Sequence, residues 1–234
     1  MLILGIESTA KAASVALWRD GEMLALNYQR TALTHSRTLL PMAESMLANT
    51  GLTPEEIDSV AVAQGPGSFT GVRIGVATAK GLCWAAEKPA VGVSTLEAMA
   101  HLALGAAEGE LICPAMDARR QQVYAALFEK KGGLTRLCPD RAVDAGELAE
   151  EIRRSGRRVY VLGDGWAVME EALKKAGVEC AVAAEALRYQ NAWGVCCAAA
   201  GKTPQSAETL LPIYLRLSQA ERERQERLAR KTLK

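Results

Sequence analysis

The first thirty residues show the apolar and alternating patterns of consecutive β-strands. Three such segments are separated by short turns: residues 2–7, 12–19 and 22–30. The first is apolar up to Glu7, as in a central strand buried on both faces, and the last alternates along its length. Asp20-Gly21 is a favoured two-residue hairpin turn. The pattern therefore predicts an antiparallel meander.

Over the next seventy residues, segments with helical periodicity alternate with short apolar runs. Helices are predicted at 36–49, 72–86 and 95–106, and strands at 59–63 and 90–93. Pro41 falls inside the first helix and predicts a kink or a later start there. Thr53-Pro54-Glu55-Glu56 has the cap, proline and returning glutamate of a helix start. The order βββαβαβα predicts a mixed sheet covered by helices.

The remaining chain repeats this order in part. Strands are predicted at 111–116, 121–128, 158–162 and 178–182, with another after the turn 131–133, and helices at 145–154, 166–176 and 191–200. We therefore expect two α/β units in tandem, residues 1–107 and a degenerate 108–217. Residues 218–234 are predicted to form a charged helix, either solvated or touching RNA, because Glu223 and Arg227 stand in the favourable i,i+4 order.

Composition excludes several classes of protein. Of 234 residues 49% are hydrophobic and 24% charged, which is enough apolar material for a core and too much for a disordered chain. The formal charge of +1 offers no general electrostatic attraction for nucleic acid. The sequence lacks a basic leader and a long charge-free stretch, and its six cysteines form no C-x-x-C. We expect a reduced cytoplasmic protein, with no membrane segment and no structural metal.

A glycine-rich loop, Gly65-Pro66-Gly67-Ser68-Phe69-Thr70-Gly71, joins a predicted strand to a predicted helix. Such a loop can present backbone N–H groups to a phosphate, which makes Gly65, Gly67 and Ser68 candidate phosphate contacts. Its spacing fits neither the dinucleotide fingerprint nor a Walker A loop. Gly75 and Ala79 continue the line of small residues, so close packing is the favoured interpretation.

The first predicted hairpin supplies a second candidate phosphate site. Glu7 ends a strand and Ser8 and Thr9 follow in the turn, as in actin-like ATPases, although serine and threonine are ordinary turn residues. The matching turn of the second unit reads Met116-Asp117-Ala118-Arg119-Arg120-Gln121. Two arginines stand where small residues would admit a phosphate, so we do not expect this chain to hydrolyse ATP by itself.

Nothing in the sequence indicates a catalytic nucleophile. There is no G-x-S-x-G motif, and the two histidines, His35 and His101, lie in a helix start and an apolar helix. Both are interpreted as capping or packing residues. No catalytic residue and no metal ligand is assigned.

The run Ala61–Gly75, continued by Ala77–Leu82, resembles the signature of the bacterial TsaB (YeaZ) proteins. Further matching segments are Ile6–Thr9, His35–Pro41, Gly92–Ala98, Met116–Arg119 and Pro212–Arg216. The resemblance implies an actin-like (ASKHA), ribonuclease-H-like fold in two halves. It also implies a part in making the threonylcarbamoyladenosine modification of tRNA.

The resemblance further implies that the related subunit TsaD, and not this chain, carries the catalytic site. The two histidines of the TsaD metal site fall here on Thr95 and Met99, neither of which is an imidazole ligand. A non-catalytic scaffold is therefore expected, which pairs with TsaD and the ATPase TsaE and reaches tRNA through the complex. No cofactor is expected on this chain alone, and ATP or ADP and a metal ion are expected in the partners. Whether the isolated chain forms a homodimer is left open.

The expected partner surface lies on the helices 36–49 and 72–86. It comprises Ser36, Leu40, Arg73, Gly75, Val76, Ala79 and Lys80. Gly75 and Ala79 would let two backbones approach, and Arg73 and Lys80 would supply polar rim contacts. Core packing of these helices within the chain is the competing interpretation. The alternative functions are a stand-alone actin-like ATPase or small-molecule kinase and, third, a metallopeptidase.

Overall fold

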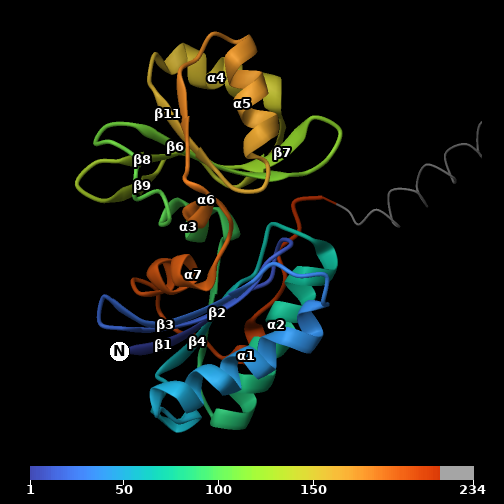
Figure 1. Ribbon diagram of the computed structural model, residues 1–234, viewed down its shortest axis with the longest axis vertical. Helices are drawn as coiled ribbons and strands as arrows, with labels where there is room; N and C mark the ends of the chain where they lie inside the picture. The colour runs from blue at the N-terminus through green and yellow to red at the C-terminus, as the bar shows by residue number, and fades with distance from the viewer. Residues whose placement is uncertain (217–234) are drawn as a thin grey trace, which may run out of the picture.

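Two β-sheets, one in each half of the chain, organise the computed structural model, which describes residues 1–216 (Figure 1). The first sheet has the order β3-β2-β1-β4-β5. Its strands are β1 Leu2–Glu7, β2 Ala13–Arg19, β3 Glu22–Gln29, β4 Ser59–Ala63 and β5 Ala90–Val93. β1 pairs antiparallel with β2 and parallel with β4, so the meander continues into a parallel half-sheet. The three predicted opening strands are confirmed.

Helices α1 (His35–Thr50) and α2 (Phe69–Ala86) cover the outer face of this sheet. Pro41 lies inside α1, and Gly51 ends that helix in the left-handed conformation. The helix predicted to start at Thr53 is only a single 3₁₀ turn, η1 (Pro54–Glu56). Its returning glutamate is present, since Glu56 Oε2 accepts the Thr53 N–H at 2.8 Å. The next residues enter β4, which leaves no room for a longer helix.

The second sheet repeats the topology of the first in the order β10-β7-β6-β11-β12, with a hairpin β8-β9 at its side. Its strands are β6 Leu111–Asp117, β7 Gln122–Ala125, β8 Phe128–Lys130, β9 Leu134–Arg136, β10 Arg141–Asp144, β11 Val159–Leu162 and β12 Cys180–Val182. Helices α4 (Ala145–Ser155) and α5 (Trp166–Lys175) cover its outer face. β6 takes the place of β1 and β11 that of β4. The tandem actin-like fold is thus confirmed.

The single strand predicted at 121–128 is present in part, because it divides into β7 and β8 at residues 126–127. Ala115–Asp117 of β6 pair with β7, whereas Leu111 and Ile112 pair with β8. Both segments pair with the same side of β6 in one continuous register, while β11 occupies the other side. The break falls at residues 126–127, where the outer neighbour changes from β10 to β9. The edge strand β10 was not predicted.

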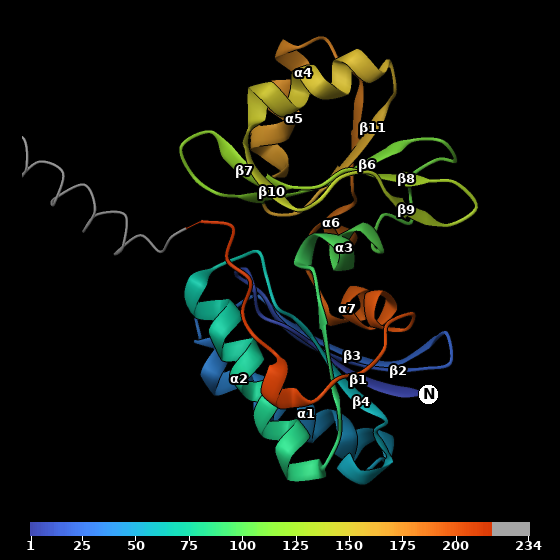
Figure 2. The same cartoon turned by 180° about the vertical axis from the view of Figure 1, so that it is seen from behind.

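Two helices are exchanged between the halves. α3 (Thr95–Ala100) follows the first sheet but packs Leu96 and Met99 on the second, among Ile112 and Phe128. α7 (Ala192–Ala199) follows the second sheet but packs on the first. Figure 2 shows both helices between the two sheets. A division at residues 107/108 therefore separates two sheets but not two packing units.

α3 is also shorter than the predicted helix 95–106. Leu102 and Ala103 are buried in the turns that follow it, so their apolar pattern reflects the core and not a helix. A short helix before α7, α6 (Glu185–Arg188), was not predicted.

After α7 the chain returns to the first half. Gln205 bridges to Ala90, a 3₁₀ turn η2 (Ala207–Thr209) lies against α2, and residues 211–216 lead toward the space between the halves. The predicted helix 218–234 lies outside the described residues. Within residues 1–216, no helix has the length and apolar character needed to cross a membrane.

Candidate functional site

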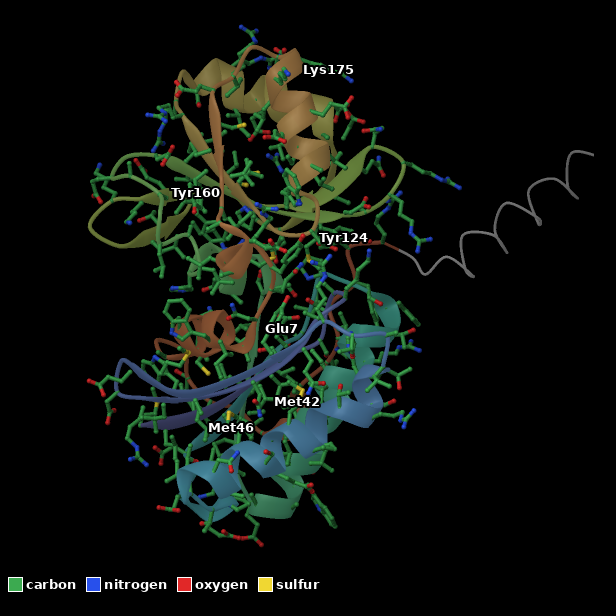
Figure 3. The ribbon with its side chains drawn as sticks, viewed as in Figure 1. Glu7, Met42, Met46, Tyr124, Tyr160 and Lys175 are labelled. Atoms are coloured by element: carbon green, nitrogen blue, oxygen red, sulfur yellow. The ribbon has the colours of Figure 1, made fainter. Side chains whose placement is uncertain are left out.

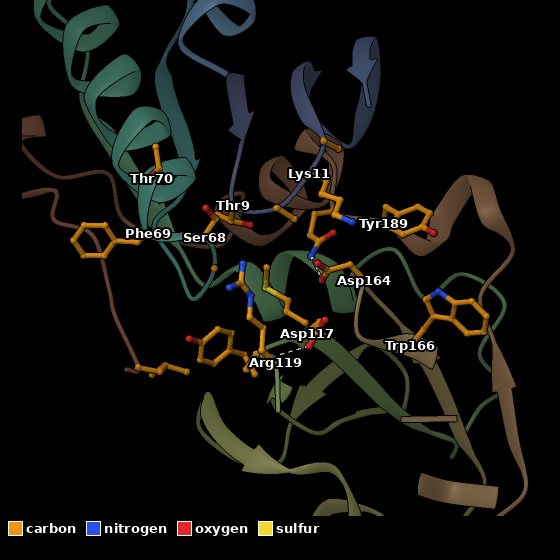
Figure 4. A pocket seen from close by; sticks show the side chains of 18 of the residues that line it. Thr9, Lys11, Ser68, Phe69, Thr70, Asp117, Arg119, Asp164, Trp166 and Tyr189 are labelled. Carbon is orange, nitrogen blue, oxygen red and sulfur yellow. Dashed lines mark hydrogen bonds between the residues drawn. The ribbon is translucent and has the colours of Figure 1, made fainter. Parts of the chain in front are cut away.

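A cavity of about 720 Å³ lies between the two halves. Its lining includes the following residues of the first half: Thr9, Lys11, Gly67, Ser68 and Phe69. From the second half it includes Asp117, Arg119, Asp164, Trp166, Tyr189 and Gln190. Figure 4 shows the two sets facing each other. The cavity occupies the cleft between two actin-like halves, so it is the first place to look for chemistry.

Glu7 ends β1 next to this cleft and is only 1% exposed (Figure 3). Its Oε1 accepts hydrogen bonds from the Thr9 N–H and the Thr9 hydroxyl, both at 2.6 Å. Its Oε2 has no hydrogen-bond partner among the described residues. Burial raises the Glu7 pKa to about 7, the bonds from Thr9 oppose that rise, and the charge of Asp164 adds to it. Glu7 is therefore a carboxyl group that holds its proton to near neutral pH.

The glycines of the loop 65–71 pack against the chain itself. A Cβ on Gly67 would lie 2.5 Å from the Thr9 carbonyl oxygen, and one on Gly71 would overlap the Ser8 carbonyl oxygen. The Ser8 hydroxyl donates to the Gly71 carbonyl at 2.9 Å, and the Ser68 N–H donates to the Thr9 carbonyl at 2.7 Å. The loop thus closes onto the β1–β2 turn, which is the packing interpretation of its glycines.

Of the six candidate phosphate contacts, three line the cavity and three do not. Thr9, Gly67 and Ser68 line the cavity, while Glu7, Ser8 and Gly65 are buried beside it. The Ser8 hydroxyl and the Thr9 N–H are both bound to protein atoms. Only Ser68 is exposed, and its hydroxyl oxygen accepts the Gly71 N–H at 3.4 Å.

The turn at the matching place in the second half has a different backbone. Asp117 Oδ1 accepts the Arg119 N–H at 2.7 Å. Arg119, Arg120 and Gln121 all have positive φ, at 63°, 54° and 60°. Three consecutive left-handed residues that are not glycine make this a strained turn. Its two arginines are exposed, and Arg119 lines the cavity.

Sequence reasoning missed two polar residues of the cavity. Gln190 Nε2 donates to Asp164 Oδ1 at 3.1 Å, the bond drawn dashed beside Asp164 in Figure 4. Gln190 is 1% exposed and its Oε1 has no partner among the described residues. Burial raises the pKa of Asp164. The signal that could have found Asp164 is its position between Gly163 and Gly165 directly after a strand, as in the first glycine-rich loop.

No set of side chains here suggests nucleophilic or metal chemistry. Burial raises the pKa of the Cys83 thiol to about 11 and that of Cys113 to about 12, so both stay protonated at neutral pH. Thr95 and Met99, at the positions of the TsaD histidines, are buried in the core. Within the described part of the chain, no three His, Cys, Asp or Glu side chains are placed to hold a metal ion.

Gly75, Val76 and Ala79 were expected on a partner surface, but the structure buries them on the inner side of α2. A Cβ on Gly75 would overlap the Ser8 hydroxyl, so the close approach that this glycine permits is to the β1–β2 turn and not to a second protein. The assignment is corrected for these three residues. These three residues lie on the side of α2 that faces the sheet. A pattern of small residues does not by itself show which side of a helix is buried.

The other four residues lie at or near the surface. Ser36 and Leu40 are exposed on α1. Arg73 and Lys80 contact the returning C-terminal segment: Arg73 Nε donates to the Tyr214 hydroxyl at 2.8 Å, and Lys80 Nζ to the Glu208 carbonyl at 3.1 Å.

The outer stripe of α2 was predicted only in part, at Arg73. It runs through Arg73, Ala77, Gly81 and Trp84, all exposed, and Trp84 is 86% exposed. A Cβ on Gly81 would meet nothing within 4 Å. The stripe therefore has two small residues, Ala77 and Gly81, between Arg73 and an uncovered tryptophan.

Comparison with known proteins agrees with the sequence resemblance. Residues 29–223 match the family described as "TsaD: tRNA N6-adenosine threonylcarbamoyltransferase". The "tRNA threonylcarbamoyladenosine biosynthesis protein TsaB" of Bacillus subtilis (strain 168) is 34% identical over 225 residues, covering 94% of this chain and 96% of that protein. Its counterpart from Escherichia coli (strain K12) is 37% identical over 181 residues, covering 76% and 78%.

A solved structure is similar over the same extent. "YeaZ from Pseudomonas aeruginosa" superposes with a TM-score of 0.77 at 27% identity, covering 92% of this chain and 99% of that one. The match thus covers nearly the whole length of the Bacillus subtilis and Pseudomonas aeruginosa proteins. The chain belongs to the TsaB (YeaZ) family, as its glycine-rich signature indicated.

Proposed function

We propose that this chain is a non-catalytic subunit of the cytoplasmic machinery that makes threonylcarbamoyladenosine in tRNA, and that it acts by docking onto TsaD. Two similar proteins are named for threonylcarbamoyladenosine biosynthesis, and the matching family is described by the transferase. The small ATPase TsaE would join the same assembly. The chain would reach tRNA through that complex.

The observation that carries the docking role is the outer stripe of α2. Trp84 is 86% exposed beside the small residues Ala77 and Gly81, with Leu40 44% exposed on neighbouring α1. An exposed aromatic residue beside small ones suits a helix-packing interface, where tryptophan often contributes most of the affinity. Ser36 and Arg73 would stand at its polar rim.

The cleft supports a non-catalytic role. The polar groups of Ser8 and Thr9 bind protein atoms, and the opposite turn carries Arg119 where an ATPase needs a second phosphate cradle. We therefore assign the nucleotide and the metal ion to the partner subunits.

The test compares two substitutions at one open position. Gly81→Arg adds a long side chain to the outer stripe without an internal clash, and Gly81→Ala adds only a methyl group. We expect Gly81→Arg to weaken association with TsaD by at least about tenfold and to lower tRNA modification by the reconstituted proteins, with Gly81→Ala near wild type. Equal affinity of the two variants would contradict the assigned face. Gly75→Leu is unsuitable as a test of this surface, because the leucine side chain would clash with Ser8 inside the fold.

The second candidate, a stand-alone ATPase or kinase, is favoured only by the cavity, which Asp164 lines and beside which Glu7 is buried. It predicts ATP turnover by the purified chain that is lost in Glu7→Ala. If the purified chain does not turn over ATP, and tRNA modification occurs only when TsaD is added, the result supports the role of a non-catalytic subunit.

A further inference from the structure

The segment Pro212–Arg216 matches the family signature, yet the docking role does not explain it. Its first anchor lies on the glycine-rich loop. The Ile213 N–H donates to the Gln64 carbonyl at 2.6 Å. A Cβ on Gly65 would overlap the Ile213 carbonyl oxygen, so this glycine lets the segment lie directly on the loop. Gly65 has φ +121°, a backbone conformation that glycine adopts easily.

The second anchor lies at the start of α2. The Tyr214 ring stacks on Phe69 with centroids 4.8 Å apart and planes 27° apart. The guanidinium of Arg73 lies 3.8 Å from the Phe69 centroid and donates to the Tyr214 hydroxyl. One arginine thus holds the segment and belongs to the outer stripe of α2.

The third anchor belongs to the other half. Arg216 Nη1 donates to the Ala118 carbonyl at 3.0 Å, in the strained turn after β6. Tyr214, Leu215 and Arg216 all line the cavity between the halves. Six residues, 211–216, therefore cross from the first half to the second at the edge of the cleft.

We propose that residues 211–216 are a latch that ties the two halves together beside the cleft, and that a partner docked on α2 releases it by engaging Arg73. The second clause rests on the proposed function, and the first does not. Arg73 is the shared element, because turning its guanidinium toward a partner on the outer stripe breaks both the bond to the Tyr214 hydroxyl and the stack on Phe69. Latch closure and docking then oppose each other, and by linkage each weakens the other by the same factor.

The isolated chain tests the latch by amide hydrogen exchange. Tyr214→Ala removes the second anchor and Arg216→Met the third, while Arg120→Met alters an exposed arginine of the same turn and serves as control. A latch predicts that segments 64–69, 116–122 and 211–216 exchange together about tenfold faster in either variant, with α4 unchanged. Faster exchange confined to 211–216 would overturn it, because the contacts would then be independent.

Binding to TsaD tests the release. Tyr214→Phe keeps the ring stack and removes the hydroxyl that holds Arg73, so it should bind TsaD about threefold to tenfold more tightly than wild type. In the wild-type complex, residues 211–216 should exchange faster than in the free chain. Equal or weaker binding by Tyr214→Phe would overturn release. If the wild-type chain fails to bind TsaD, the release clause and the proposed function both fall, while exchange in the isolated chain still decides the latch.

Discussion

The two halves have the same strand order but end their first strands differently. In the first half, Glu7 is buried and the following turn binds the glycine-rich loop. In the second, Asp117 is exposed and leads into a turn of three left-handed residues that is open to the cavity. The first turn is thus part of the core, whereas the second is surface.

The loops after β4 and β11 are more alike. A Cβ on Gly163 would overlap the Ala115 carbonyl oxygen, and one on Gly165 would lie 2.8 Å from the Met116 carbonyl carbon. In both halves, then, glycine stands where the loop before a helix crosses the end of the first strand. Close backbone approach explains the glycines of both loops, so a glycine-rich loop is not in itself evidence for phosphate binding in this chain.

The largest difference between the end of β1, at Glu7, and the end of β6, at Asp117, is expected in the pH dependence of stability. The folded chain keeps the Glu7 proton to about pH 7, while the unfolded chain releases it near pH 4.5. Between these values the folded state binds more protons, so the free energy of unfolding should fall by about 3 kcal/mol as pH rises. Glu7→Gln should flatten this slope in urea unfolding at pH 5 and pH 8. Asp117→Asn, at the exposed matching position, should retain it, and an unchanged slope in Glu7→Gln would refute the assignment.

Two alanine substitutions on α2 should change the free energy of unfolding in opposite directions. Gly71→Ala forces a methyl group into the Ser8 carbonyl and should cost about 1–3 kcal/mol of unfolding free energy. Gly81→Ala meets open space and should gain up to about 1 kcal/mol from helix propensity. Urea unfolding of both variants measures the difference. Equal effects would mean that the loop does not pack tightly on the β1–β2 turn.

A glycine substitution should sharpen the contrast between the two turns. Arg120 has φ 54°, so Arg120→Gly relieves left-handed strain and should stabilise the fold by about 0.5–1 kcal/mol. Ala10, in the turn of the first half, has no positive φ, so Ala10→Gly should destabilise it slightly. Melting temperatures decide the matter, and a loss of stability in Arg120→Gly would show that the turn is unstrained.

The smallest effect is expected at Thr95, which stands where TsaD has a metal ligand. Its hydroxyl is buried with no partner among the described residues. Thr95→Val replaces that hydroxyl with a methyl group and should change stability by less than about 0.5 kcal/mol, on the stabilising side. Modification by the reconstituted proteins should stay near wild type. A large loss of activity in a folded variant would assign chemistry to this position.

Local patterns predicted most elements well. β1 and β4 were predicted with their observed bounds, and α2 ends at Ala86 as expected. These elements depend on apolar runs and periodicity, which neighbouring residues determine. The predictions departed from the structure where one strand is broken as its outer neighbour changes, between β7 and β8, and where buried residues continue past a helix end, at Leu102.

The sequence alone determined the family, the tandem α/β order and the turns at which the first strands end. Only the tertiary structure decided which side of α2 faces the core, where residues 211–216 run, and that Asp164 and Gln190 meet beside the first half. The physical reason is that a small residue suits a buried and an exposed helix face equally well. The choice depends on elements far away in the chain, here the β1–β2 turn, which packs against Gly75, and the returning C-terminal segment, which contacts Arg73.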